Sequence, residues 1–193
     1  MNERSGIDLF ILERHDYGMT PKSYTDFQVS IAQFCKANRL VKGVDVIEAI
    51  NDPNLITNYE LFAMFIKSPT ILIADRVMFD AKYVWNDEAV VIVSSLGCEK
   101  ERDEYCRTHD LRGLEIAVNI LSAMKFIPIY ENPDDPTSNV IGTTTVFVNE
   151  SDFGGSIPKW LVQKFLPMSI HEMYEDVVVT TRKMSGLDGP PNK

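Results

Sequence analysis

One stretch of the chain decides the fold: NESDFGGSIPKWLV, residues 149–162. It leads from an alternating strand into residues 157–184, a segment longer than any strand expected in this chain. Ser156 can cap a helix, and Pro158 suits the first turn of one. Apolar residues recur at helical spacing on both sides of Pro167, which should bend the helix axis. The sequence therefore predicts a long C-terminal helix that begins close to Ser156.

Strands are expected over much of the remaining chain, because apolar and polar residues alternate with period two between turn-forming residues. The expected strand segments are residues 6–14, 24–36, two or three strands within 61–95, and then 111–121, 126–130 and 141–149. Residues 43–59 instead carry apolar side chains at helical spacing, up to a break at Asn51-Asp52-Pro53, and predict one short helical layer. Residues 97–110 are dense in charge and lack periodicity, which indicates a long loop.

These elements predict the fold class. Hairpins, one helical insertion and a long final helix do not alternate as βαβ units, which favours a mixed α+β domain over a doubly wound one. A curved antiparallel sheet that wraps around the C-terminal helix can leave an apolar cavity between them. The length of 193 residues, 45% of them hydrophobic, suits one domain over residues 1–184. Residues 185–193 contain two consecutive prolines and predict a loose tail.

The composition argues against several classes of protein. The net charge of −9 and the pI near 4.8 argue against nucleic-acid binding, which draws its affinity from clustered Lys and Arg. Residues 1–12 form neither a signal peptide nor a membrane-spanning helix, so the expected location is the cytoplasm. Cys35, Cys98 and Cys106 are odd in number and lack CxxC spacing, so a disulfide framework is not expected.

The residue pattern does not support catalysis. His15, His109 and His171 are scattered, and none belongs to a recurring nucleophile motif. Cys106 and His109 form a Cys-x-x-His pair, but the sequence has no second pair, and a solvated loop explains this one better than a metal site. We therefore expect no enzyme activity, no cofactor and no bound metal.

Residues 149–162 resemble the end of the StAR-related lipid transfer (START) domain, where a strand meets Gly, then Ile-Pro-x-Trp, then the closing helix. Ser68-Pro69 followed by Ala74-Asp75-Arg76 is similar to the beginning of that family's fourth strand. The family usually has an acidic and an aromatic residue after the Arg, where this chain has Val77 and Met78.

A third motif, Leu111-Arg112-Gly113, resembles the start of the family's sixth strand and is preceded, as in the family, by a long loop. The motifs stand in the family's order and spacing. The resemblance covers roughly residues 6–184, but the helix that ordinarily opens such domains has no counterpart before Gly6. The family's helical Trp is also replaced, near Asn58-Tyr59.

The resemblance implies a helix-grip fold with an internal tunnel for one sterol, phospholipid, ceramide or similar lipid, which the domain transfers between membranes or senses. The implied partners are a lipid and, transiently, a membrane surface; protein partners stay open. Two alternatives keep the fold: a lipid-responsive regulatory module of a larger protein, and a cyclase-like enzyme. The enzyme would need converging acid, base or nucleophile groups in the pocket, which the sequence does not assemble.

One expected strand carries an unusual set of charges. Arg76, Met78, Asp80 and Lys82 lie on the same face of it. If that face is outside, the charges need no explanation. If it lines a cavity, Arg76 or Lys82 must be paired, with Asp80 or a lipid head group as candidates, because an isolated buried charge is heavily penalised. The resemblance implies that Arg76 is an inward head-group contact, whereas a solvated face is the usual position for Lys82 and Arg112.

The C-terminal helix supplies the apolar candidates for the site. Its large side chains suit plain core packing, and the same residue types suit contact with an acyl chain or a sterol. The predicted lipid-binding residues are Arg76, Met78, Lys82, Arg112, Trp160, Leu161, Phe165 and Met168.

Overall fold

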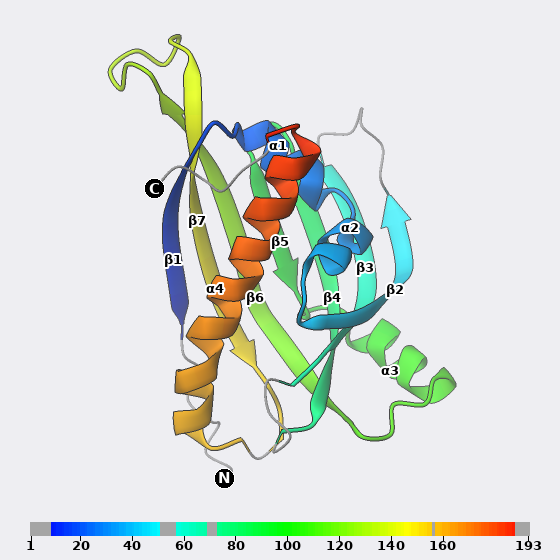
Figure 1. The fold of residues 1–193 in the computed structure, drawn as a ribbon. Coiled ribbons are helices and arrows are strands. Elements are labelled where there is room, and N and C mark those ends of the chain that lie inside the picture. The colour runs from blue at the N-terminus through cyan, green and yellow to red at the C-terminus, as the bar shows by residue number, and fades with distance from the viewer. Residues whose placement is uncertain (1–8, 51–56, 69–72, 156, 188–193) are drawn as a thin grey trace.

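The computed structural model describes residues 9–50, 57–68, 73–155 and 157–187, and Figure 1 shows their arrangement. The elements follow one another as β1 (Phe10–Tyr17), α1 (Pro21–Gln28), α2 (Ile31–Ala37), β2 (Val41–Ile50), β3 (Thr57–Ile66), β4 (Asp75–Trp85), β5 (Val90–Ser94), α3 (Glu99–Thr108), β6 (Leu114–Tyr130), β7 (Val140–Asp152) and α4 (Lys159–Met184). This order of antiparallel strands, short helices and one long final helix is that of an α+β domain.

The described strands form one sheet in the order β1-β7-β6-β5-β4-β3-β2. Neighbours in this order pair antiparallel. β5 has only 5 residues. Where β5 does not separate them, β4 and β6 pair directly and in parallel, with Asp75 opposite Leu114. Figure 1 shows the sheet curving around α4. The predicted curved antiparallel sheet with a long C-terminal helix is therefore confirmed, apart from the short parallel pairing of β4 and β6.

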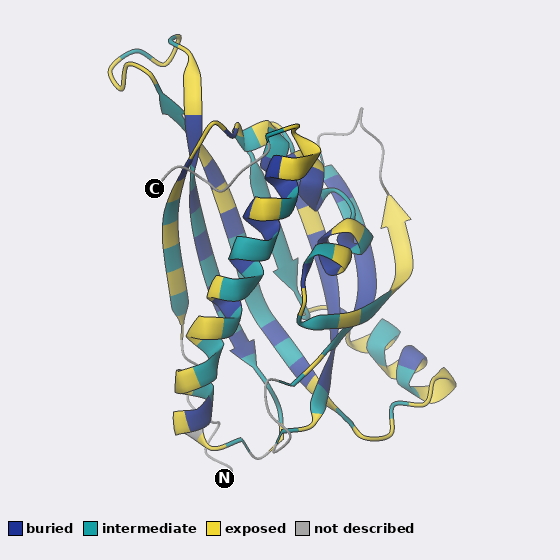
Figure 2. Cartoon of the chain, viewed as in Figure 1, coloured by how far each residue is buried: buried dark blue, intermediate teal, exposed yellow. Residues whose placement is uncertain are grey.

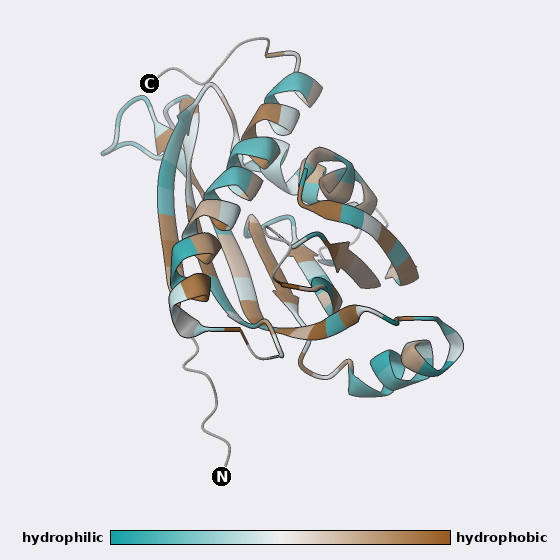
Figure 3. Cartoon of the chain, turned by 60° about the horizontal axis from the view of Figure 1, so that its bottom comes forward, coloured by the Kyte–Doolittle hydropathy of each residue, from teal (hydrophilic) through white to brown (hydrophobic). Residues whose placement is uncertain are grey.

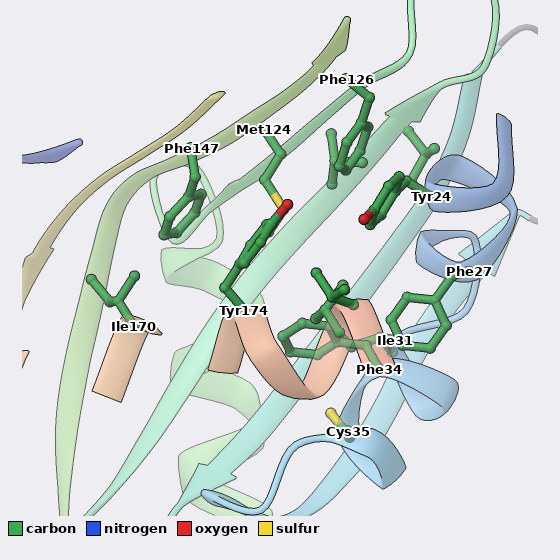
Figure 4. Packing of buried hydrophobic residues seen from close by; sticks show 14 of the residues in the cluster. Tyr24, Phe27, Ile31, Phe34, Cys35, Met124, Phe126, Phe147, Ile170 and Tyr174 are labelled. Atoms are coloured by element: carbon green, nitrogen blue, oxygen red, sulfur yellow. The ribbon is translucent and has the colours of Figure 1, made fainter. Parts of the chain in front are cut away.

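The main core lies between the inner face of the sheet and the helices α1, α2 and α4, and Figure 4 shows its centre. It contains Tyr24 and Phe27 from α1, Ile31 and Phe34 from α2, Phe62, Val84, Val91, Met124, Phe126 and Phe147 from the sheet, and Ile170, Tyr174, Val177 and Val178 from α4. Burying each large apolar side chain stabilises the fold by roughly 1.5–3 kcal/mol. Buried and exposed residues alternate along α4 (Figure 2), because this helix buries only one side.

The helix α3 packs on the other face of the sheet. Its Tyr105 joins a small apolar cluster with Ala63, Val77 and Phe79, and the rings of Phe79 and Tyr105 meet edge to face at 5.3 Å. The Tyr105 hydroxyl also donates a hydrogen bond to Asp45 of β2. Because side chains alternate along a strand, the intervening residues of β4 face α4 and the main core.

The strand predicted over residues 24–36 is wrong, because these residues form α1 and α2. Thr20 caps α1 by accepting a hydrogen bond from the backbone N–H of Ser23, and Pro21 fits its first turn. Each helix has buried side chains three and four residues apart: Tyr24, Phe27 and Gln28 in α1, and Ile31, Phe34 and Cys35 in α2. This helical period, supported by the cap, outweighs the period-two pattern from which the strand was predicted.

The helical layer predicted for residues 43–59 is also wrong, because the chain forms β2 here and pairs with β3. The register shifts between Val46 and Glu48, so Ile47 is an extra residue, a β-bulge. The apolar residues at helical spacing do not mark a buried helix face, because Val46, Ile47 and Ile50 are all exposed in β2. The break predicted at Asn51-Asp52-Pro53 lies outside the described residues.

The loop predicted over residues 97–110 contains the helix α3 instead. Figure 3 shows α3 as mostly hydrophilic, and this absence of an apolar stripe hid the helix from the sequence pattern. Glu99 and Glu101 in its first turn and Arg107 in its last turn suit the helix dipole. Tyr105 alone is buried among its described residues and anchors it to the sheet.

Some predicted boundaries also change. The strands predicted over 111–121 and 126–130 are one continuous strand, β6. Gly6, Pro69 and Ser156 lie outside the described residues, and so does the expected tail beyond Leu187.

Candidate ligand-binding cavity

A cavity of about 160 Å³ lies between α4, the short helices α1 and α2, and the inner face of the sheet. A second cavity of about 110 Å³ lies next to it along α4. The residues that line both are Leu40, Ile66, Phe153, Leu166 and Ser169. Apolar side chains make up most of both linings, so the adjoining cavities suit an elongated apolar molecule.

Alternation along β3 and β4 decides which side chains reach the cavity. Phe62, Met64 and Ile66 of β3 and Met78, Asp80 and Lys82 of β4 line the first cavity. The sequence left open whether the charged face of β4 points outward or into a cavity. Asp80 and Lys82 point into the cavity.

Lys82 forms a buried ion pair with Glu60, its cross-strand neighbour in β3, and the atoms Nζ and Oε2 are 2.5 Å apart. Glu60 Oε2 also accepts a hydrogen bond from the backbone N–H of Ile31 at 2.7 Å, and Lys82 donates to the carbonyl of Val29 at 3.4 Å. Burial lowers the pKa of Lys82, while the Glu60 carboxylate opposes that change. The expectation of a solvated Lys82 is wrong: the pair holds the junction between α1 and α2 on the sheet.

Asp80 is the second charged residue at the first cavity, and none of its surface is exposed. Ser95 donates a hydrogen bond from its hydroxyl to Asp80 Oδ1 at 2.5 Å. The other oxygen, Oδ2, has no hydrogen-bond partner among the described residues. Burial raises the pKa of Asp80 to about 6, although the side chains of Ser95 and Asn119 act in the opposite direction.

A row of amides and hydroxyls from β6 and β7 extends this polar region of the first cavity. Asn149 donates to the hydroxyls of Ser122 and Ser151 at 2.7 and 3.1 Å. Ser122 donates to Asn119 Oδ1 at 3.0 Å, and the Asn119 amide donates to the carbonyl of Val93 at 3.4 Å. Most polar groups of this row are therefore satisfied by one another and by the backbone of Val93.

The predicted site residues divide into two groups. Met78 and Lys82 line the first cavity, and Arg76, Leu161 and Phe165 line the second. The other three, Arg112, Trp160 and Met168, line neither cavity.

The three residues outside the cavities are exposed. The side chain of Arg112 is 90% exposed and pairs with Asp110, while Trp160 and Met168 are 63% and 53% exposed. These two side chains of α4 point away from the described cavities, because the helix buries only one side. A contact of these three residues with a lipid stays a prediction.

Arg76 is buried at the second cavity, where its Nε donates to the carbonyl of Phe153 at 2.8 Å. It also donates from a terminal nitrogen to the carbonyl of Ala74. Burial lowers its pKa. These bonds connect the start of β4 to the segment after β7, and the head-group contact of Arg76 stays a prediction.

Sequence reasoning missed most of the polar residues that line the first cavity or pair with its lining. Glu60, Asn119, Ser122, Asn149 and Ser151 were not selected from the sequence. A usable signal existed in β7, where Asn149 and Ser151 are two residues apart and continue the inward face of Phe147. Polar residues in place of hydrophobic ones on an inward face indicate a polar patch inside the domain.

Neither a comparison with models of known protein families nor a search of curated proteins finds a match to this sequence. Solved structures do match it. Human STARD10 aligns over 92% of this chain and 66% of its own, with a TM-score of 0.63 and 14% identity. Human StAR-related lipid transfer protein 5 aligns over 92% and 76%, with a TM-score of 0.63 and 18% identity. The fold is START-like.

A third similar structure is the aromatase/cyclase Zhui from Streptomyces, which aligns over 93% of this chain and 94% of its own. Its TM-score is 0.57 and its identity 5%. Proteins named for lipid transfer and for cyclisation thus share the architecture of this START-like domain, which spans only about two thirds of the STARD10 chain. Function must therefore be argued from the cavity.

Two kinds of feature are absent from the described residues of this START-like domain. In the part of the chain that the structure describes, no helix is long and apolar enough to cross a membrane. Within the same residues, no group of three or more His, Cys, Asp or Glu side chains could hold a metal ion.

Proposed function

We propose that this START-like domain binds one lipid-like molecule in the cavity beside α4 and either transfers it between membranes or senses it. The observation that carries the proposal is the largely apolar cavity between α4 and the sheet. The fold supports it, because two of the similar structures are those of STARD10 and a StAR-related lipid transfer protein.

The physical advantage of such a carrier is kinetic. Moving a chain of about sixteen carbons from a bilayer into water costs on the order of 10 kcal/mol, at about 0.8 kcal/mol per methylene. A protein that replaces the bilayer with its own apolar walls removes most of that cost. The proposal therefore includes transient contact with a membrane surface and a cytoplasmic location, with α4 as the element that moves to admit the ligand.

We propose binding without chemical turnover. His15, His109 and His171 are all exposed, and none of them lines either cavity. The Zhui structure keeps a cyclase-like enzyme as the alternative, in which Asp80 would be the available acid or base because its pKa lies near neutrality.

Native mass spectrometry of the protein purified from a eukaryotic host tests this proposal. We expect a complex of one chain with one lipid-like molecule, whose mass is unchanged after incubation and organic extraction. A chemically altered molecule after incubation would favour the enzyme. A protein that carries no ligand and takes none up from vesicles of phospholipid, sterol and ceramide would overturn the proposal.

A further inference from the structure

The two charged residues that line the first cavity, Lys82 and Asp80, differ in how well their charges are compensated. Lys82 and Glu60 neutralise each other, and both are also bound to backbone groups at the junction of α1 and α2. Asp80 has no cationic partner among the described residues, and only one of its two oxygens accepts a hydrogen bond. A buried carboxylate oxygen without a donor costs free energy, so native proteins rarely leave one without a hydrogen-bond partner.

Most donors of the neighbouring side chains are already used. The Asn119 amide donates to the carbonyl of Val93, and Ser122 donates to Asn119 Oδ1. Asn149 donates to two serine hydroxyls of the same row. The row on β6 and β7 therefore uses most of its donors itself. Asp80 lines the first cavity, and its Oδ2 has no hydrogen-bond partner among the described residues.

We infer that Asp80 Oδ2 accepts a hydrogen bond from a hydroxyl or amide N–H group at the polar end of the bound molecule. The ligand class is then an uncharged amphiphile with a hydrogen-bond donor. This inference rests on the proposed function and deepens it by naming the chemistry that the cavity recognises.

The charge balance argues against an anionic polar end in the first cavity. Its charged lining residues are Asp80 and Lys82, and the Lys82 ammonium is already neutralised by Glu60. A phosphate or carboxylate placed beside Asp80 would meet a like charge in surroundings of low dielectric constant, where repulsion is strong. An uncharged donor avoids this repulsion and satisfies the remaining carboxylate oxygen.

A matched set of small amphiphiles tests the inference. The probes are 1-decanol, decyl methyl ether and decanoate, each measured by displacement of the neutral fluorophore N-phenyl-1-naphthylamine at about pH 8. Asp80 is ionised there, because its pKa is about 6. We expect wild-type protein to bind the alcohol about tenfold more tightly than the ether, the effect of one hydrogen bond to a charged group. Decanoate should bind more weakly than the alcohol.

Asp80→Asn is the decisive variant. Its amide still offers an oxygen to Ser95, and it places an N–H donor where Oδ2 was, so an ether oxygen becomes an acceptable partner. The variant should then bind the alcohol and the ether with about equal affinity, mainly because it binds the ether more tightly than wild type does. Asp45→Asn is the matched control, since Asp45 lies on the other face of the sheet and accepts a hydrogen bond from Tyr105. It should keep the wild-type preference.

Each remaining outcome decides against the inference. Equal binding of alcohol and ether by wild-type protein, tightest binding of decanoate, or an unchanged preference in Asp80→Asn would overturn it and leave the proposed function intact. Failure of wild-type protein to bind the fluorophore and all three probes would contradict the proposed function itself.

Discussion

Tyr174 of α4 donates its hydroxyl to Asp16 Oδ2 of β1 at 2.8 Å, and both residues are buried. Tyr24 of α1 donates to the same oxygen at 2.9 Å. Burial raises the pKa of both tyrosines, so they remain protonated donors at neutral pH. One carboxylate thus joins an end strand of the sheet to the long helix and to the first short helix.

Tyr174→Phe should lower the free energy of unfolding by about 1–2 kcal/mol, because α4 loses one hydrogen bond to a charged acceptor while the ring still packs. Urea denaturation measures the difference. Tyr17→Phe is the control, since Tyr17 is 48% exposed in the same strand as Asp16 and its change should stay within about 0.5 kcal/mol. Equal losses in the two variants would show that the hydroxyl of Tyr174 does not fasten α4.

Asp80→Asn should stabilise the protein at neutral pH but not in acid. The pKa of Asp80 is about 6 in the folded protein, against an ordinary 3.8, so stability that is present below pH 3.8 is lost as the pH rises through about 6. Asn does not ionise, and its advantage over wild type should grow to about 3 kcal/mol above that range. Urea denaturation of both proteins from about pH 4 to about pH 8 checks this, and a difference independent of pH would contradict it.

Lys82→Met should destabilise the fold by about 3–5 kcal/mol, because the buried Glu60 carboxylate loses its cation. Adding Glu60→Gln removes the charge but keeps an oxygen for the N–H of Ile31, so the double variant should recover most of the loss. Chemical denaturation of the wild type, the two single variants and the double variant completes a double-mutant cycle. Additive losses would mean that the two side chains do not act as a pair.

Ser169→Trp should abolish ligand binding, because Ser169 lines both cavities and an indole ring would fill the space between them. His171→Trp makes a comparable change at an exposed position of the same helix and should leave binding as in wild type. Native mass spectrometry and a thermal melt of each variant separate loss of ligand from loss of fold. Retention of one ligand by folded Ser169→Trp would place the ligand elsewhere.

Sequence patterns predicted the long helix and most strands, because a hydrophobic period depends on local sequence alone. They failed at residues 24–36, predicted as a strand but folded as α1 and α2, and at α3, whose only buried described residue is Tyr105. They also failed at β2, where the bulge at Ile47 interrupts the period. The site was harder to predict from the sequence than the fold. That Glu60 pairs with Lys82 while Asp80 keeps an oxygen without a partner depends on how β3, β4 and β6 align, and no local pattern carries that information.

The extra residue in β2 also changes how the outer edge of the sheet can pair with another molecule. β2 is the last strand of the sheet, and its Val46, Ile47 and Ile50 are 44%, 41% and 49% exposed. An apolar outer strand of this kind would ordinarily be a template on which a second molecule could add its own strand and begin aggregation. The bulge at Ile47 breaks the regular row of backbone donors and acceptors, so an incoming strand could pair over only a few residues. The bulge thus discourages the protein from aggregating along this edge.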